Sequence, residues 1–474
     1  MIKEKNMSEN TNNFTICPEN QKEIETLLLT PEGRKKISLE LKRKMEVVLA
    51  DMEPKFLERE ELIRLLFLAI FSRHHVFLIG LPGVGKTYLV EALRDVFQDS
   101  RYWSLLLDKE TSRDQLFGKL AYEGTKTIFE EEDTVLGSEF IFLDEMFKAS
   151  SELLNSLLQI MADRVYSVKG KHKAVPLNTL FGASNELPEG KLIAPFKDRL
   201  LIWFDVPRLQ KDSSFKKLIS RQFDSTRNFR EKFWLEEIRL STLISKHVIV
   251  SEEILDIYTL IKNNMDRACI QISDRKLLWI MDVLTTSAVL NGRDEVNVSD
   301  LFLLPNMTWH TEIEKKNSRK IVHEVLFGNE NTINKAVIEV EANLNRKKAN
   351  YNINFKRLFD YLEDFTGLTA EKRFNEIYNN IRNGRNGIQE IVNDSSTLVQ
   401  LYEFSINIEK LVTENIMVPD YKCLVFSNKT VELIQQHKIV SSNILEEFDV
   451  FLNEVDSLSE YRSRRGERRM RKTA

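Results

Sequence analysis

The chain has 474 residues, of which 42% are hydrophobic and 30% charged, and its formal net charge is −4. This balance is typical of a soluble globular protein with about two to four domains, and it gives no overall reason to expect a nucleic acid or an anionic membrane as partner. Cys17, Cys269 and Cys423 are too few and too widely spaced to suggest a disulfide framework or a zinc site. The amino terminus lacks an apolar signal core, and the longest apolar stretch, residues 62–71, is too short to span a bilayer, so we expect a cytoplasmic protein.

The first strand of the predicted core, residues 75–80, leads through a glycine-rich loop into a helix that begins near Thr87 and extends to about Phe97. The loop fits G-x-x-x-x-G-K-[ST], in which backbone N–H groups surround a phosphate. Lys86 would neutralise the β and γ phosphates of ATP, and the Thr87 hydroxyl would hold Mg²⁺. The alternative is a glycine-rich turn with a solvated lysine. The residues expected to contact the nucleotide are Gly80, Leu81, Pro82, Gly83, Val84, Gly85, Lys86, Thr87 and Tyr88.

Two further strands follow, over residues 102–107 and 139–143. The second is an apolar run that ends in Asp144 and Glu145. Asp144 would position Mg²⁺, and Glu145 would orient and deprotonate the water that attacks the γ-phosphate. Taken alone, the pair would equally fit a strand that leads into a solvated turn, and the upstream loop favours the catalytic interpretation.

Residues 151–164 carry leucines on one helical face and predict an amphipathic helix. A hairpin that turns near Gly170 follows, and then a strand over residues 177–184 that ends at Asn185. Asn185 could hydrogen-bond both the attacking water and the γ-phosphate, or it could cap a turn. With a last strand over residues 200–206, the pattern predicts a parallel sheet of five strands covered by helices on both faces.

Apolar residues recur at helical spacing from about Arg208 onward, which predicts a helical lid. Beyond it, a mainly helical region without assignable motifs ends in a basic tail, residues 461–474. The tail could contact nucleic acid or an acidic partner, although such tails are more often solvated. The predicted divisions are 1–48, an N-terminal helical extension; 49–207, the α/β core; 208–310, the lid; and 311–474, the accessory region.

The stretches "GLPGVGKT", "FIFLDEMFKAS", "FGASNELPE" and "KDRLLIW" resemble the MoxR branch of the AAA+ ATPases, and most of all its RavA group. The resemblance covers about residues 55–309. It implies a ring, most often a homohexamer, in which each ATP lies between two subunits. Gly80 to Thr87 then resemble the Walker A loop, Asp144 and Glu145 the Walker B pair, and Asn185 the sensor 1 residue.

The resemblance also implies two catalytic arginines. Arg199 looks like the arginine finger that stabilises charge on the γ-phosphate of the neighbouring subunit, and Arg275 resembles the sensor 2 arginine of the lid. Arg199 could instead form a surface ion pair with Asp198, and Arg164 is also placed near an interface in this fold. "MADR" stands where the family often has Asn-Glu-Arg, so the role of Arg164 stays open.

Residues 117–137 match a family insertion that would project toward the pore, as would the hairpin around "VKGKHK". Relatives of this family commonly work with a von Willebrand A domain partner, which favours an ATPase that remodels a protein client. Two alternatives are a nucleic-acid motor, for which Lys169, Lys171, His172 and Lys173 would supply a basic pore, and a nucleotide-controlled scaffold that rarely hydrolyses ATP.

Overall fold

The computed structural model describes residues 21–327, with gaps at 124–125, 131–132, 169–170, 187–192 and 223–225, and residues 410–419. Ile16 and single positions beyond residue 341 are also described. The basic tail, Lys169 and most of the accessory region lie outside these residues. The chain divides into two compact units, the first comprising Met1–Val322 with Leu411–Asp420, and the second His323–Lys410 with Tyr421–Ala474.

The core of the first unit is a five-stranded parallel sheet with the strand order β10-β1-β9-β6-β3. All five predicted strands are confirmed, each within one or two residues of the expected ends. Apolar runs form the central strands because both of their faces are covered. The strands are β1 (His75–Ile79), β3 (Tyr102–Leu106), β6 (Phe140–Asp144), β9 (Thr179–Ser184) and β10 (Leu200–Asp205).

Helices from both halves of the chain pack around this sheet. Helix α6 confirms the amphipathic pattern, because Leu153, Leu157 and Met161 are buried on one face and Ser150 caps its first turn. The helices are α1 (Gln21–Leu28), α2 (Pro31–Met52), α3 (Glu60–Ser72), α4 (Lys86–Arg94), α5 (Arg113–Phe117), α6 (Ser151–Asp163), α7 (Ala194–Arg199), α8 (Asp212–Ile219), α9 (Leu235–Ser245), α10 (Glu252–Arg267), α11 (Asp274–Leu290) and α12 (Glu312–Phe327), and the 3₁₀ segments are η2 (Glu53–Lys55), η3 (Met146–Lys148) and η5 (Val298–Asn306).

The N-terminal helix α2 packs against the lid helices α9 and α11. A buried ion pair joins α2 to α9, with Lys44 Nζ 2.8 Å from Glu237 Oε2 and neither side chain more than 3% exposed. The boundary predicted after residue 48 falls inside α2, and the proposed domain division stays a prediction. In the described part of the chain, no helix is both long and apolar enough to cross a membrane.

The helix predicted to extend to Phe97 ends at Arg94, and the region expected to be a purely helical lid contributes a short strand. Strand β2 (Phe97–Gln98) pairs in parallel with β11 (Phe233–Trp234). Phe97 packs with Phe67, Phe71 and Phe233 at ring-centroid distances of 5.8–6.2 Å. Burial of these aromatic side chains outweighs the local helical pattern, which is a tertiary effect that periodicity alone does not report.

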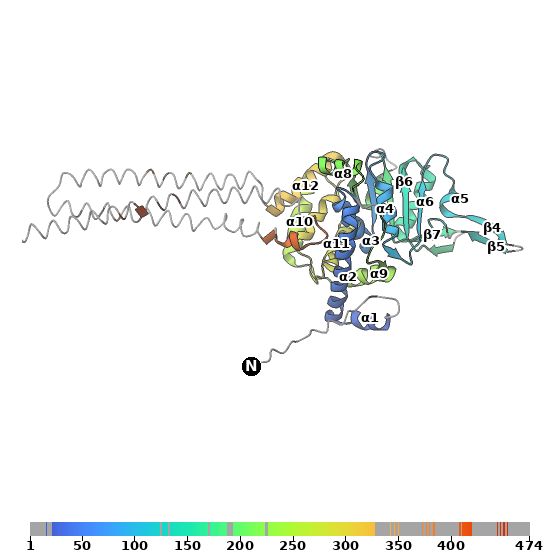
Figure 1. Ribbon diagram of the computed structural model, residues 1–474, viewed down its shortest axis with the longest axis horizontal. Coiled ribbons are helices and arrows are strands. Elements are labelled where there is room, and N and C mark those ends of the chain that lie inside the picture. The colour runs from blue at the N-terminus through green and yellow to red at the C-terminus, as the bar shows by residue number, and fades with distance from the viewer. Residues whose placement is uncertain are drawn as a thin grey trace, which may run out of the picture. The chain divides into compact units, whose positions relative to one another are not determined.

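Two hairpins leave the core. One, β4 (Lys119–Glu123) with β5 (Lys126–Glu130), extends beyond the sheet (Figure 1) and lies in the segment expected to be an insertion. The other, β7 (Val165–Val168) with β8 (Lys171–Ala174), confirms the hairpin predicted around Gly170, although its turn lies outside the described residues. That either hairpin points into a pore stays a prediction.

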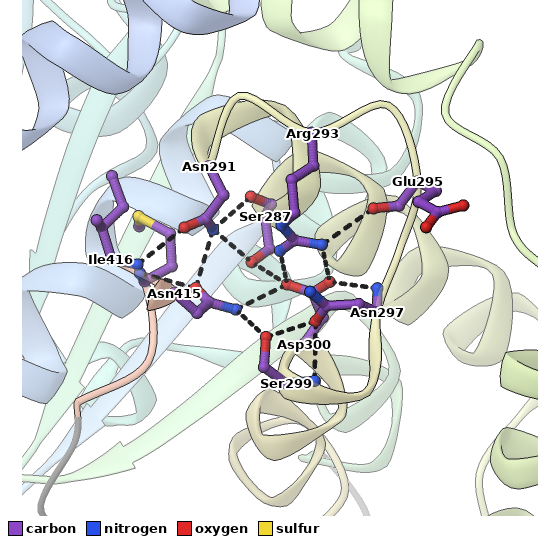
Figure 2. Close-up of polar contacts among 10 residues, drawn as sticks. Ser287, Asn291, Arg293, Glu295, Asn297, Ser299, Asp300, Asn415 and Ile416 are labelled. Atoms are coloured by element: carbon purple, nitrogen blue, oxygen red, sulfur yellow. Dashed lines mark hydrogen bonds and ion pairs between the residues drawn. The ribbon is translucent and has the colours of Figure 1, made fainter. Parts of the chain in front are cut away.

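A segment from the far end of the chain returns to the first unit beside the end of α11 (Figure 2). Asn415, which is 2% exposed, donates to Asp300 Oδ1 at 3.0 Å and to Ser299 Oγ at 2.8 Å. It accepts from Asn291 Nδ2 at 2.9 Å, and Asn291 Oδ1 accepts from the Ile416 amide at 2.8 Å. Because buried polar groups must be hydrogen-bonded, this network selects one placement of residues 411–418 against the lid.

Candidate nucleotide-binding site

The predicted phosphate-binding residues converge at the carboxyl edge of the parallel sheet. Strands β1, β9 and β6 are neighbours, and each ends beside a predicted site residue. The glycine-rich loop follows β1, Asn185 follows β9, and Asp144 ends β6. The carboxyl ends of parallel strands are the usual location of ligands in open α/β sheets. The sheet topology therefore brings together residues separated by up to about a hundred positions.

The loop between β1 and α4 has the geometry that its glycines allow. Gly83 and Gly85 have φ values of 80° and 88°, and an added Cβ would meet no atom within 4 Å at either position. Glycine is therefore required for its backbone conformation and not for space. Gly85 is the N-cap of α4, so the positive end of that helix faces the loop.

Lys86 lies buried at the start of α4, with 6% of its surface exposed. Its ammonium group donates to the carbonyls of Gly80 and Leu81 and to Asn185 Oδ1, the last at 3.0 Å. Burial lowers the pKa of Lys86, and the nearby carboxylates of Asp144 and Glu145 oppose that shift. The site thus holds a cation whose present partners are neutral oxygens that a phosphate could replace.

The pair Thr87 and Asp144 offers the oxygen ligands that Mg²⁺ prefers. The Thr87 hydroxyl lies 3.4 Å from Asp144 Oδ2, and Asp144 Oδ1 accepts from the Glu145 amide at 3.0 Å. In the described part of the chain, no cluster of three or more His, Cys, Asp or Glu side chains could hold a metal ion. Two protein oxygen ligands suit Mg²⁺ that arrives with a nucleotide, because the nucleotide carries most of the other oxygen ligands.

Glu145 and Asn185 are held together at the centre of the site. Asn185 Nδ2 donates to Glu145 Oε1, while Asn185 Oδ1 accepts from Lys86, so one amide joins the expected base to the expected phosphate-binding cation. Glu145 is 8% exposed and has a φ of 51°, which is uncommon for a residue with a side chain. Such backbone strain concentrates at functional sites. Lys148 Nζ lies 3.4 Å from Glu145 Oε2.

Arg59 is a buried contact of the loop that motif reasoning missed. It donates to the carbonyl of Val84 at 3.3 Å and to that of Pro207 at 2.8 Å. It is 7% exposed, and both contacts are to backbone, so no charge pattern in the sequence points to them. Arg59 therefore joins the loop to the segment that follows β10. The ring of Tyr88 lies 5.4 Å from that of Phe56.

Arg199 and Arg275 lie at the opposite edge of the sheet from Lys86. Arg199 immediately precedes β10, whose first residue pairs with His75 at the start of β1. The loop lies at the other end of these strands. At a rise of about 3.3 Å per residue, the length of β10 puts about 17 Å between the two edges. Arg275 Nη1 lies 3.5 Å from Asp198, so the lid arginine accompanies Arg199 and not Lys86. Among the described residues, neither arginine forms a hydrogen bond or an ion pair with the loop between β1 and α4.

The two candidate finger arginines differ in their contacts. Arg164 donates through Nε to the Leu177 carbonyl at 3.1 Å and through Nη2 to the Arg73 carbonyl, and burial lowers its pKa to about 10. Arg199 donates only to the Pro195 carbonyl, and its buried Nε has no hydrogen-bond partner among the described residues. The alternative ion pair between Arg199 and Asp198 is not formed, because Asp198 contacts Ser273 and Arg275.

Comparison with known proteins agrees with this fold. Residues 43–242 match the family described as the MoxR domain in the MoxR-vWA-beta-propeller ternary systems, and residues 253–322 match the AAA lid domain. The chain belongs to the MoxR family of AAA+ ATPases. Its closer resemblance to the RavA group stays a prediction.

Individual relatives span different parts of the chain. Two uncharacterized proteins of Methanocaldococcus jannaschii are each 30% identical, over 69% and 56% of this chain and 86% and 71% of their own lengths. The chaperone MoxR1 of Mycobacterium tuberculosis is 26% identical over 31% of this chain and 40% of its own. A crystal structure of a Cytophaga hutchinsonii protein, described as a candidate ATPase, has a TM-score of 0.53 at 17% identity, covering 63% of this chain and 98% of that one. That similarity concerns the fold alone.

Proposed function

We propose that the protein binds ATP with Mg²⁺ and hydrolyses it to ADP and phosphate within a ring of identical subunits. The observation that carries the proposal is the contact chain Lys86–Asn185–Glu145 beside the pair Thr87–Asp144. It supplies a phosphate-binding cation, a carboxylate base, a polar link between them and oxygen ligands for Mg²⁺, all at one edge of the sheet.

Each group has a task in this reaction. Lys86 exchanges its carbonyl partners for the β and γ phosphate oxygens. The Glu145 carboxylate accepts a proton from the attacking water, whose oxygen bonds to the γ-phosphorus as the bond to the β-phosphate oxygen breaks. Asn185 holds Glu145 in place while contacting Lys86. Thr87 and Asp144 would hold Mg²⁺, which supplies charge neutralisation at the phosphates.

The arginine for this reaction comes from a neighbouring subunit. Arg199 precedes β10 at the opposite edge of the sheet from the loop, and within the described residues its guanidinium has one hydrogen bond, to its own helix. In comparable enzymes, an arginine supplied across an interface raises the rate of phosphoryl transfer by a factor of about 10³ to 10⁵. We therefore propose that Arg199 acts in trans, with Arg275 beside it, and that hydrolysis depends on assembly, most simply as a homohexamer.

The energy of ATP hydrolysis would be used to remodel a protein client, and a von Willebrand A domain protein would take part as partner. Support comes from the matched family, whose description names such a partner, and from a relative described as a chaperone. A nucleic-acid motor would instead show hydrolysis that DNA stimulates. A scaffold that is switched by nucleotide would bind ATP with little turnover.

The test measures steady-state ATP hydrolysis by Arg199→Ala and Glu145→Gln, alone and mixed. Each variant alone should be inactive, because one lacks the donated arginine and the other lacks the base. In a one-to-one mixture with subunit exchange, about a quarter of the interfaces join an intact Glu145 to a neighbour's intact Arg199. Activity should recover there. Absence of recovery despite exchange, confirmed by mass spectrometry, would contradict a trans arginine, and wild-type activity in Arg199→Ala would point to Arg164.

A further inference from the structure

The segment that carries Arg199 is held by the first turn of a lid helix. Lys276, on α11, donates to the carbonyl of Lys197 at 3.2 Å. Its Nζ also lies 2.9 Å from His310 Nε2, which is itself 3.1 Å from the same carbonyl. Lys276 is 2% exposed. A buried lysine thus contacts the backbone two residues before Arg199.

The neighbouring residue of α7 is held by the same turn of α11. Ser273, the N-cap of α11, donates its hydroxyl proton to Asp198 Oδ1, and Arg275 lies 3.5 Å from Asp198 Oδ2. The Arg275 guanidinium also lies over the ring of Trp279. Three residues within the span 273–276 therefore contact the two positions that directly precede Arg199.

His310, the partner of Lys276, makes further contacts of its own. The His310 amide donates to Glu314 Oε2 at 2.7 Å, and the imidazole packs edge-on against Trp203, with ring centroids 5.0 Å apart. Burial lowers the pKa of Lys276 to about 7 and that of His310 to about 4. Near neutral pH the imidazole is therefore neutral, so Lys276 and His310 do not repel each other as two cations.

Within the described part of the chain, the side chain of Arg199 forms a single hydrogen bond, and that bond is to its own helix. Its Nη1 donates to Pro195 of its own helix at 2.9 Å, and its Nε is buried without a hydrogen-bond partner among the described residues. The direction of its guanidinium consequently follows the orientation of the α7 backbone. That orientation depends on the contacts that α11 makes at Lys197 and Asp198.

We propose that Lys276 is a positioning residue, which holds the end of α7 so that Arg199 reaches the nucleotide of the neighbouring subunit. The inference rests on the proposed function, in which Arg199 acts in trans. Through this contact, the lid of one subunit controls hydrolysis in the next. A change in the angle of α11 would move Arg199 without any change at the lid's own nucleotide.

The experiment uses Lys276→Met, which keeps most of the buried stem and removes the donor. Alone, the variant should lose about tenfold or more in kcat, equivalent to about 1.4 kcal/mol or more, with an unchanged KM for ATP. Mixed one to one with Glu145→Gln, it should regain hydrolysis as Arg199→Ala does, because its own base is intact and the neighbour donates a well-placed arginine. A structural defect within its own site would not be rescued in this way.

The outcomes separate the two proposals. Recovery with Arg199→Ala but not with Lys276→Met overturns the positioning role and leaves the trans arginine standing. If neither Arg199→Ala nor Lys276→Met recovers hydrolysis when mixed with Glu145→Gln, both the trans arginine and the positioning role are overturned. Ser273→Ala serves as a second, milder variant should Lys276→Met fail to fold, and it should show a smaller loss of kcat that mixing also rescues. The matched control is Lys262→Met, an exposed lysine on α10 paired with Asp266, which should leave kcat unchanged.

Discussion

The two edges of the central sheet each hold a buried lysine, and the two lysines have different surroundings. At the carboxyl edge, Lys86 contacts two carbonyls and an amide oxygen, with the carboxylates of Asp144 and Glu145 nearby to favour its charge. At the amino edge, Lys276 contacts one carbonyl and an imidazole, and burial lowers its pKa to about 7.

The difference shows what each lysine is suited to do. Binding a polyphosphate requires a positive charge, and nearby carboxylates help to preserve it in a partly desolvated loop. Holding a backbone carbonyl requires only an N–H donor, which a neutral amine still supplies. A buried lysine whose pKa falls to about 7 despite the carboxylates of Asp198 and Glu314 is thus better suited to a structural contact than to anion binding.

The largest expected effect is at the base. Glu145→Gln should lower ATP hydrolysis by about 10² to 10⁴, because the amide cannot accept the proton of the attacking water. ATP binding should remain, and the assembled form should accumulate. Phosphate release and calorimetry measure the two quantities. Glu152→Gln, at an exposed position in the first turn of α6, is the control and should hydrolyse ATP normally. Wild-type hydrolysis in Glu145→Gln would exclude Glu145 as the base.

A second comparison separates the two arginines. Arg164→Ala should lower the free energy of unfolding by about 2–4 kcal/mol, because it leaves the carbonyls of Leu177 and Arg73 without their donor. Arg199→Ala should leave stability within about 0.5 kcal/mol of wild type, since it loses one contact to its own helix. Chemical denaturation followed by circular dichroism gives both values. Equal destabilisation would show that Arg199 is structural as well.

At the phosphate loop, Lys86→Ala should weaken ATP binding by about 10- to 100-fold, the usual range for losing a charged hydrogen-bond donor. Isothermal titration calorimetry with Mg²⁺ present measures the change. Lys35→Ala, on the exposed side of α2, removes a lysine paired only with Asp294 and should bind ATP as wild type does. Near-normal affinity in Lys86→Ala would contradict the assignment of the loop.

The last expected effect is a pH dependence at Lys276. Its pKa is about 7 in the folded protein and ordinarily 10.5, so between these values the unfolded chain binds one more proton. Stability should therefore rise with pH over this window, by about 1.4 kcal/mol per pH unit from this group. The groups that face it are Lys197, Asp198, His310 and Glu314. Lys276→Met should lack this part of the slope in denaturation curves at pH 7–9, and equal slopes would contradict the lowered pKa.

Much of the carboxyl edge could be predicted because each motif is contiguous. An apolar run followed by Asp144 and Glu145, or by Asn185, marks the end of a buried strand, and parallel strands collect such ends at one edge. The prediction that the first helix reaches Phe97 was wrong at its C-terminal end. Phe97 instead packs in an aromatic cluster with residues of α3 and β11, and this packing determines the conformation there.

The sequence alone determined the five strands, the loop and the order of the site residues, since spacing along a strand or helix sets which side chains share an edge or a face. Only the tertiary structure decided that Lys276 contacts Lys197, 79 positions away, and that Asn415 enters the lid beside Asn291. These contacts join backbone carbonyls and amide side chains, which nearly every segment offers, so no local pattern distinguishes the chosen partner. Packing selects it, because a buried polar group is stable only where the fold supplies a partner.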